Sequence, residues 1–129
     1  MTVQTGDRAI VLFAHGARDP AWRRPFDAIA LAIKQTAPET RVELAFLELM
    51  EPRLPEVAER LYHQGLRRLL IIPVFLSQSG HVMRDLPQII ERIMADHAGL
   101  VIEVGTAIGE EKTVVDAIAK ACLERVQTR

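Results

Sequence analysis

Cysteine is almost absent from this sequence, with one residue in 129. A single cysteine cannot form a disulfide within the chain, and such scarcity is typical of proteins from reducing compartments. Aromatic residues make up only 5% of the chain, so it lacks the stacking surfaces that bind single-stranded nucleic acids. An excess of one charge is also missing, because 17 acidic residues offset 16 lysines and arginines. We therefore expect no nucleic-acid partner, since such proteins are usually strongly basic.

Long apolar runs and low-complexity segments are missing as well. No apolar run approaches the roughly 20 residues that a membrane-spanning helix needs, and the first residues lack the pattern of a signal peptide. We therefore expect no membrane partner and a cytoplasmic location. The sequence has no linker rich in proline, glycine or serine, and 49% of its residues are hydrophobic. This composition predicts one globular domain over residues 1–129 with a substantial core.

Apolar runs and amphipathic segments alternate along the chain. Strands are expected at residues 8–15, 41–49, 69–76 and 100–106, and helices at 20–37, 52–64, 82–97 and 110–126. This βαβαβαβα order predicts an α/β fold, with a four-stranded parallel sheet and helices on both faces. In the last helix, Val115, Ile118, Cys122 and Val126 are in phase. We expect Cys122 to be a small core residue.

Three side chains that can bind metals stand at or just beyond the ends of successive strands. His15 ends the first strand, Glu48 ends the second, and His81 follows the third, so that 33 residues separate each from the next. Matching positions of successive parallel units emerge at one edge of the sheet, so these side chains should converge there. Two nitrogens and one oxygen suit Co²⁺, Fe²⁺, Ni²⁺ or Zn²⁺. Structural zinc usually has four protein ligands, so an incomplete set favours a metal held for reaction.

Each of these residues has a simpler explanation when it is taken alone. A histidine at a strand end is more often a hydrogen-bonded structural residue, and Glu48 could pair with Arg53. The matched spacing favours the joint site, although spacing alone is not specific. The other two histidines fit structural positions. His63 falls on the polar side of the second helix, and His97 lies at a helix end where an imidazole can meet free carbonyl groups.

Basic residues and a small-residue loop are expected near the same edge. The arginines are Arg18, Arg23, Arg24, Arg53 and Arg84. Surface arginines in solvent are the simpler explanation for any one of them, but several at one edge suit a ligand rich in carboxylates. The loop 77–80 (Ser-Gln-Ser-Gly) opens a helix, so its backbone N–H groups could also hold anionic groups.

Three segments together resemble the class II tetrapyrrole chelatases, and more closely the short sirohydrochlorin chelatases of the CbiX type. They are residues 14–20 (AHGARDP), 45–49 (AFLEL) with Pro52, and 73–87 (PVFLSQSGHVMRDLP). The resemblance runs over nearly the whole chain, in order and with matching spacing. It implies insertion of Co²⁺ or Fe²⁺ into sirohydrochlorin, on the way to cobalamin or sirohaem.

The resemblance also implies roles for individual residues. His15, Glu48 and His81 would bind the metal and act in catalysis, with His15 also accepting a proton. The residues expected to contact the substrate are Arg18, Glu51, Leu76, Ser77, Gln78, Ser79 and Gly80. No tightly bound cofactor is expected, because the divalent metal (Co²⁺, Fe²⁺ or Ni²⁺) is itself a substrate. The family often has serine in place of Ala17 and glycine in place of Ser79, and neither departure affects the expected ligands.

A flat tetrapyrrole is large beside one four-stranded domain, and longer family members carry two such units that face one another. The resemblance therefore implies a homodimer in which the site-bearing edges face each other. Two alternatives stay open. One is a non-catalytic carrier of metal or tetrapyrrole that uses the same residues. The other is a phosphoryl-transfer enzyme, prompted by His15-Gly16 after the first strand but weakened by the lack of a glycine-rich phosphate loop.

Overall fold

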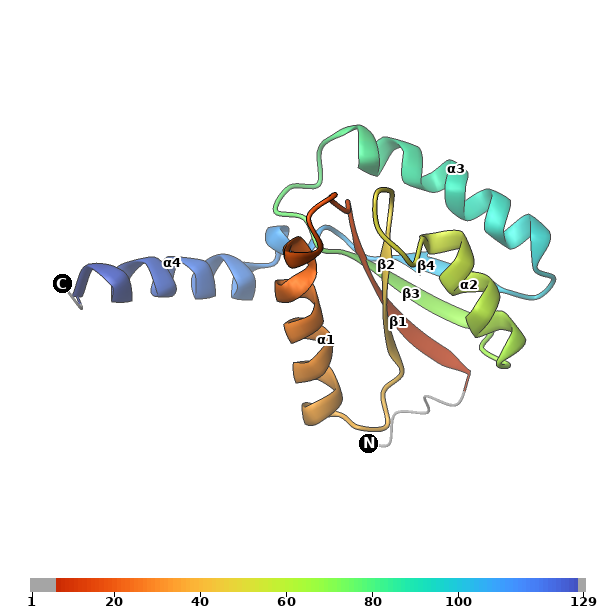
Figure 1. The fold of residues 1–129 in the computed structure, drawn as a ribbon, viewed down its shortest axis with the longest axis horizontal. Coiled ribbons are helices and arrows are strands. Elements are labelled where there is room, and N and C mark those ends of the chain that lie inside the picture. Colours follow the sequence, from red (N-terminus) through yellow and green to blue (C-terminus); the bar gives the residue numbers. More distant parts are fainter. Residues whose placement is uncertain (1–6, 128–129) are drawn as a thin grey trace.

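Four parallel strands form a single sheet in the computed structural model, which describes residues 7–127 (Figure 1). The strands are β1 (Arg8–Ala14), β2 (Val42–Phe46), β3 (Arg68–Pro73) and β4 (Val101–Val104), in the order β2-β1-β3-β4. Every neighbouring pair is parallel. The predicted α/β fold is confirmed. The expected domain limits, residues 1 and 129, lie outside the described residues. Most of the first residues, which lack the pattern of a signal peptide, lie outside them too.

Helices cover both faces of this sheet, as predicted. They are η1 (Pro20–Arg23), α1 (Arg24–Thr36), α2 (Leu54–His63), α3 (His81–Asp96), η2 (Ile108–Glu110) and α4 (Lys112–Gln127). Helices α2 and α3 lie on one face and α1 lies on the other (Figure 1). The first helix opens with a 3₁₀ turn, where the Asp19 side chain accepts a hydrogen bond of 2.9 Å from the Ala21 N–H. This acidic cap explains why the helical segment starts at Pro20.

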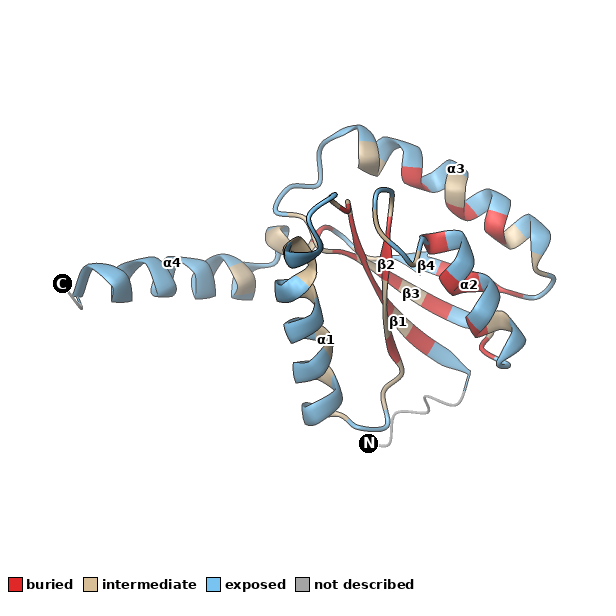
Figure 2. Ribbon diagram, in the orientation of Figure 1, coloured by how far each residue is buried: buried red, intermediate tan, exposed pale blue. Residues whose placement is uncertain are grey.

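The main core lies between the sheet and helices α2 and α3 (Figure 2). Val11, Phe13 and Ile71 point to this side from the two central strands and are fully buried. The helices contribute side chains spaced at three or four residues, namely Val57, Leu61, Leu86, Ile90 and Ile93. Burial of a side chain of this size contributes about 1.5–3 kcal/mol, so this layer holds the strands in register.

Helix α4 does not join the packing. It projects away from the sheet, and its side chains are exposed almost throughout (Figures 1 and 2). Cys122, which we expected in the core, is exposed. That prediction is wrong for this chain. The spacing of apolar residues predicts a helix with an apolar face, but it does not show which surface covers that face. Among residues 7–127, no helix is long and apolar enough to cross a bilayer.

All four strands end earlier than predicted, the first by one residue at Ala14 and the others by two or three residues. The runs to residues 49, 76 and 106 give strands that end at Phe46, Pro73 and Val104. The residues beyond these ends leave the sheet and form loops at its carboxyl edge. The positions expected to carry the site therefore lie on loops and at a helix start, where side chains can reach a ligand.

Candidate metal and macrocycle site

The carboxyl ends of β1, β2 and β3 open onto one edge of the sheet, which we call the rim (residues 15–18, 47–51 and 74–81). His15 directly follows β1, and Glu48 lies two residues beyond β2. His81 is the first residue of α3, at the end of the segment that follows β3. Because the strands are parallel, the matched spacing places all three residues on segments that leave this edge.

Backbone contacts beyond the strand ends hold His15 beside Glu48. The Leu47 N–H donates to the Ala14 carbonyl at 2.9 Å, and the Glu48 N–H donates to the His15 carbonyl at 3.2 Å. Gly16 has a φ of +95°, and a Cβ there would lie 1.9 Å from the Glu48 carbonyl oxygen. Glycine at this position therefore permits the close approach of the two segments.

The two side chains form an open pair. Nε2 of His15 lies 3.8 Å from Oε1 of Glu48, with side-chain exposures of 42% and 50%. Nδ1 of His15 lies 3.2 Å from the Gly16 carbonyl oxygen, so the tautomer protonated at Nδ1 donates there and leaves a lone pair on Nε2. Two atoms bound about 2.0–2.2 Å from one tetrahedral ion lie about 3.3–3.6 Å apart. Small rotations of these two half-exposed side chains would therefore let Nε2 and Oε1 share one divalent cation.

Distance alone does not identify this pair as a metal site. His63 and Glu59, one turn apart on α2, form a pair of almost the same length at 3.9 Å, with exposures of 73% and 63%. His63 lies on the solvent side of α2, as predicted. The His15 pair differs in its position at the strand ends and in the carbonyl that orients its ring. The α2 pair is therefore a natural control for any metal-binding measurement.

The structure brings together two of the three predicted ligands. His81 is exposed at the start of α3. Within residues 7–127, no three histidine, cysteine, aspartate or glutamate side chains are grouped so that they could hold a metal ion. A ligand set that includes His81 therefore requires its side chain to move toward the His15–Glu48 pair.

The loop before His81, residues 76–80, is the site loop. Its Ser77 and Ser79 hydroxyls are 2.7 Å apart, and the Ser79 N–H donates to Ser77 Oγ at 3.1 Å. The Gln78 N–H donates to Glu110 Oε2 at 2.9 Å, while Gln78 Oε1 accepts from the Ala107 N–H at 2.5 Å. Two of the N–H groups that we expected to be available for an anionic ligand are therefore already bonded within the protein.

The short helix η2 braces the site loop from the side of β4. The Gly109 N–H donates to the Phe75 carbonyl at 2.9 Å. A Cβ at Gly109 would lie 2.3 Å from the Cα of Leu76, so this contact requires glycine. Leu76 itself is 73% exposed and presents an apolar surface at the rim. Sequence reasoning missed η2, because it lies between an expected strand and an expected helix and carries no periodic signal.

The predicted arginines differ in what they contact. Arg18 is exposed at the rim. Arg23 is used structurally, because it pairs with Asp27 at 3.2 Å, donates to the Glu51 carbonyl at 3.2 Å and lies 5.2 Å from the centre of the Phe46 ring. Arg18 is therefore the better placed of the two to meet an anionic ligand.

Glu51 has an acidic neighbour in Glu56, at the start of α2. Partial desolvation, a hydrogen bond with Glu51 and the negative charge of Glu51 raise the pKa of Glu56 above its ordinary value. The charge of Arg53 acts in the opposite direction. Negative charge is therefore concentrated on the α2 side of the rim.

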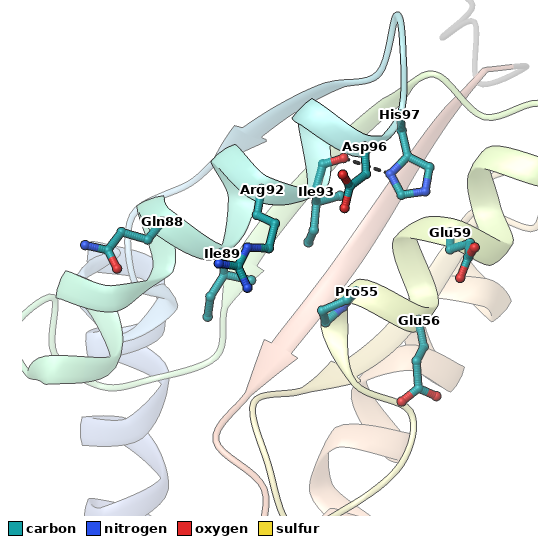
Figure 3. Close-up of a pocket in the computed structure, with 9 residues that line it drawn as sticks. All are labelled: Pro55, Glu56, Glu59, Gln88, Ile89, Arg92, Ile93, Asp96 and His97. Carbon is teal, nitrogen blue, oxygen red and sulfur yellow. Dashed lines mark hydrogen bonds between the residues drawn. The ribbon is translucent and has the colours of Figure 1, made fainter.

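Of the two cavities that α3 lines, the larger lies outside the rim and has Glu56 on its wall. It has a volume of about 510 Å³ and is lined by Pro55, Glu56, Glu59, Gln88, Ile89, Arg92, Ile93, Asp96 and His97, from α2, α3 and its end (Figure 3). The His97 ring meets the Ile93 carbonyl at 2.7 Å, as expected of a histidine at a helix end. The second cavity, of about 240 Å³, is lined by Gln78 of the site loop together with α3 and the end of β4. The candidate site is therefore the rim, where His15 and Glu48 lie, and not the larger cavity.

Known proteins share this fold and sequence pattern. The CbiX family model matches residues 9–125. The sirohydrochlorin cobaltochelatase of Methanococcus aeolicus is 34% identical over 82 residues, which cover 64% of this chain and 57% of that protein. The structure of a CbiX protein from Marinobacter aquaeolei has 30% identity and a TM-score of 0.82, and covers 94% of this chain and 96% of its own. The sirohydrochlorin chelatase SirB from Bacillus subtilis subspecies spizizenii, in complex with cobalt, has 26% identity and a TM-score of 0.78.

Two of these relatives are longer than this chain, whereas the Marinobacter protein is matched over 96% of its own length. The chain spans 57% to 62% of the length of three curated cobaltochelatases that it matches. The match to SirB covers 92% of this chain but 50% of the SirB chain. One copy of this fold therefore corresponds to half of the longer relative.

Proposed function

Because the chain belongs to the CbiX family, we propose that it inserts a divalent metal, Co²⁺ or Fe²⁺, into sirohydrochlorin during cobalamin or sirohaem biosynthesis. The observation that carries this proposal is the open His15–Glu48 pair at the rim, with Nε2 and Oε1 separated by 3.8 Å. The cobaltochelatase name of a relative and the cobalt bound in the SirB structure support the same chemistry.

In the proposed mechanism, His15 and Glu48 receive the metal ion and His81 joins them as a third ligand. Fewer than four protein ligands leave positions open for the macrocycle nitrogens, and the ion can then be transferred. Two pyrrole N–H protons leave as the doubly charged ion enters, so the charge balances. Once the ion has passed to the macrocycle, Nε2 of His15 no longer binds it and accepts one of these protons, because imidazole is a suitable acceptor near neutral pH, and the other proton leaves to water. No tightly bound cofactor is required.

We place the macrocycle against the site loop. The exposed Leu76 side chain offers it an apolar contact, and Ser77, Gln78, Ser79 and Gly80 form the adjoining edge. Arg18 is exposed at the rim and can pair with a substrate carboxylate. The negative charge around Glu51 suits the approach of a cation rather than that of the carboxylates.

The proposal includes a homodimer with facing rims and a cytoplasmic location. The dimer is supported by the match to half of the SirB chain, since two copies of this fold would equal one longer relative. Sedimentation that gives only monomer at micromolar concentration would count against the dimer. Imaging a fluorescent fusion in cells would test the location.

An anaerobic absorbance assay with sirohydrochlorin and Co²⁺ tests the function. Turnover beyond one equivalent per chain would establish an enzyme, whereas one bound equivalent would indicate a carrier. We expect His15→Ala and His81→Ala each to lose most of the insertion rate while the fold is kept, and His63→Ala to match the unmodified chain. Near-normal insertion rates in both His15→Ala and His81→Ala would contradict the assignment of these histidines to the metal site. Rates with Co²⁺, Fe²⁺ and Ni²⁺ would identify the preferred metal.

A further inference from the structure

Helix α4 carries an apolar face that its own chain leaves exposed. Val115, Ile118, Cys122 and Val126 follow one another at helical spacing, so they form a stripe along the helix, which we call the α4 stripe. Val115 is 50% exposed and Val126 is 72% exposed. The helix points away from the sheet, so this stripe faces solvent over its length (Figure 2). An apolar helical stripe of this kind normally packs on another element.

The sheet has an incompletely covered face, on which three apolar residues lie next to an exposed Arg68–Glu103 ion pair of 3.9 Å. Leu70, Ile72 and Val101 alternate with residues of the main core, so they point to the opposite face, where α1 lies. Helix α1 packs mainly on β2, at the far edge from β4. Val101 is 49% exposed, and Leu70 and Ile72 are partly exposed. We call these three residues the sheet strip.

The helix and the strip match in size and position. The 16 residues of α4 span about 24 Å, and the six residues of β3 span about 20 Å. The part of this face that α1 leaves uncovered lies over β3 and β4, where a helix of this length could pack beside α1. The chain therefore holds both halves of one contact, yet the structure keeps them apart.

The connection before α4 holds the helix away from the sheet strip of its own chain. Helix η2 is fixed to the site loop by the bond from the Gln78 N–H to Glu110 Oε2, and to the residue before the loop by the bond from the Gly109 N–H to the Phe75 carbonyl. Only Glu111 separates η2 from α4, and its carbonyl accepts from the N–H groups of Val114 and Val115 at 3.0 Å each. The direction of α4 is therefore set by η2. Folding back onto the same chain would require a change of the backbone dihedrals at Glu111, which is extended between η2 and α4.

We propose that two copies of this chain exchange their α4 helices, so that each α4 stripe covers the sheet strip of the other copy. Such an interface is self-complementary, as twofold dimers require, and exchange of an identical element is a common route to a dimer. The inference deepens the homodimer proposed above by supplying its contact. It rests on the pairing of chains and not on metal insertion.

The exchange also bears on the site. Helix α4 leaves the molecule next to the site loop, on the rim side of the sheet (Figure 1). A partner held by α4 is therefore brought to the side where His15 and Glu48 lie. Glu110 of η2 accepts the bond from the Gln78 N–H, so anchoring α4 in a partner steadies the site loop as well.

Sedimentation of the full chain is the first test. We expect a mass of twice 14.4 kDa at micromolar concentration. Ile118→Asp would place a carboxylate in both symmetric contacts, so the dissociation constant should rise by roughly 100-fold or more. Ala117→Asp introduces the same charge on the same helix but off the α4 stripe, and it should stay dimeric. Both residues are exposed in the single chain, so both variants should fold, as circular dichroism can verify.

Cross-linking distinguishes exchange from folding back. One chain carries Val101→Cys and Cys122→Ser, and it is mixed with the unmodified chain, whose only cysteine is Cys122. A short bifunctional maleimide should join the two at twice the single-chain mass. The matched control places the new cysteine at Glu91, on the outer face of α3, and should give no such product.

The outcomes separate this inference from the proposed function. A monomer at all concentrations overturns the exchange. A cross-link within one chain would also overturn it. In that case a Val101→Cys chain that keeps Cys122 would lose both thiols to the maleimide yet keep the single-chain mass. Neither result affects the metal-insertion assay. A cross-linked dimer without insertion activity would support the exchange and contradict the chelatase function.

Discussion

Substitution of Gly16 by alanine should damage the candidate site through the backbone alone. At φ +95°, a residue with a Cβ is strained, which costs about 1–2 kcal/mol. The added Cβ would also lie 1.9 Å from the Glu48 carbonyl oxygen and 3.1 Å from its carbon. Both groups are backbone, so no side-chain rotation relieves the contact, and the two segments must separate.

The expected magnitude follows from these two costs. Overpacking of this kind typically costs a further 1–3 kcal/mol, so Gly16→Ala should lose about 2–5 kcal/mol of unfolding free energy. The shift also separates His15 from Glu48, whose 3.8 Å spacing is already wider than the roughly 3.3–3.6 Å between two ligand atoms of one tetrahedral ion. Metal affinity should therefore fall by roughly 10–100-fold, the range typical for disturbed ligand orientation.

Gly65→Ala provides a matched control within the same chain. Gly65 has the same φ of +95°, but a Cβ there would meet no heavy atom within 4 Å. It should lose only the conformational cost of about 1–2 kcal/mol and keep normal metal affinity. Urea unfolding and Co²⁺ titration of both variants measure the difference. Equal unfolding midpoints and equal affinities would refute the role assigned to Gly16.

Two more substitutions test the surroundings of the rim. A raised pKa means that folded Glu56 holds its proton more tightly than the unfolded chain does, so its contribution to stability is lost as pH rises above the ordinary value of 4.5. Glu56→Gln should therefore raise the midpoint of urea unfolding more at pH 7 than at pH 4. Glu91→Gln, at an exposed position on α3, is the control. An equal effect of Glu56→Gln at both pH values, or the same pH dependence in the control, would contradict this. Gly109→Ala places a Cβ 2.3 Å from the Cα of Leu76, so it should push η2 off the site loop and speed hydrogen exchange at the Gln78 amide. Unchanged exchange there would show that η2 does not brace the loop.

Local patterns accounted for the architecture. The branched apolar run that contains β3 and the helical spacing of Leu86, Ile90 and Ile93 each follow from burial within one element. Parallel order then placed the strand ends at one edge, where Nε2 of His15 and Oε1 of Glu48 lie 3.8 Å apart. The role of His81 stays a prediction, because its position depends on the conformation of an exposed loop.

Contacts between distant segments could not be predicted from the sequence. The role of Gly16 depends on a carbonyl 32 residues away, and no local pattern identifies that neighbour. Glu110 and Gly109 brace the site loop from a segment without periodicity. Cys122 was misplaced for a related reason, since an amphipathic helix does not specify whether its partner belongs to the same chain.

Titration with Co²⁺ in the absence of the macrocycle tests most directly whether His15 and Glu48 hold the ion. The chain offers its own control in the His63–Glu59 pair, which has nearly the same atom separation on another surface. We predict that His15→Ala weakens Co²⁺ binding by roughly tenfold or more, while His63→Ala leaves it unchanged. Unchanged binding in His15→Ala, or loss of binding in His63→Ala, would contradict the assignment of the metal site to the rim.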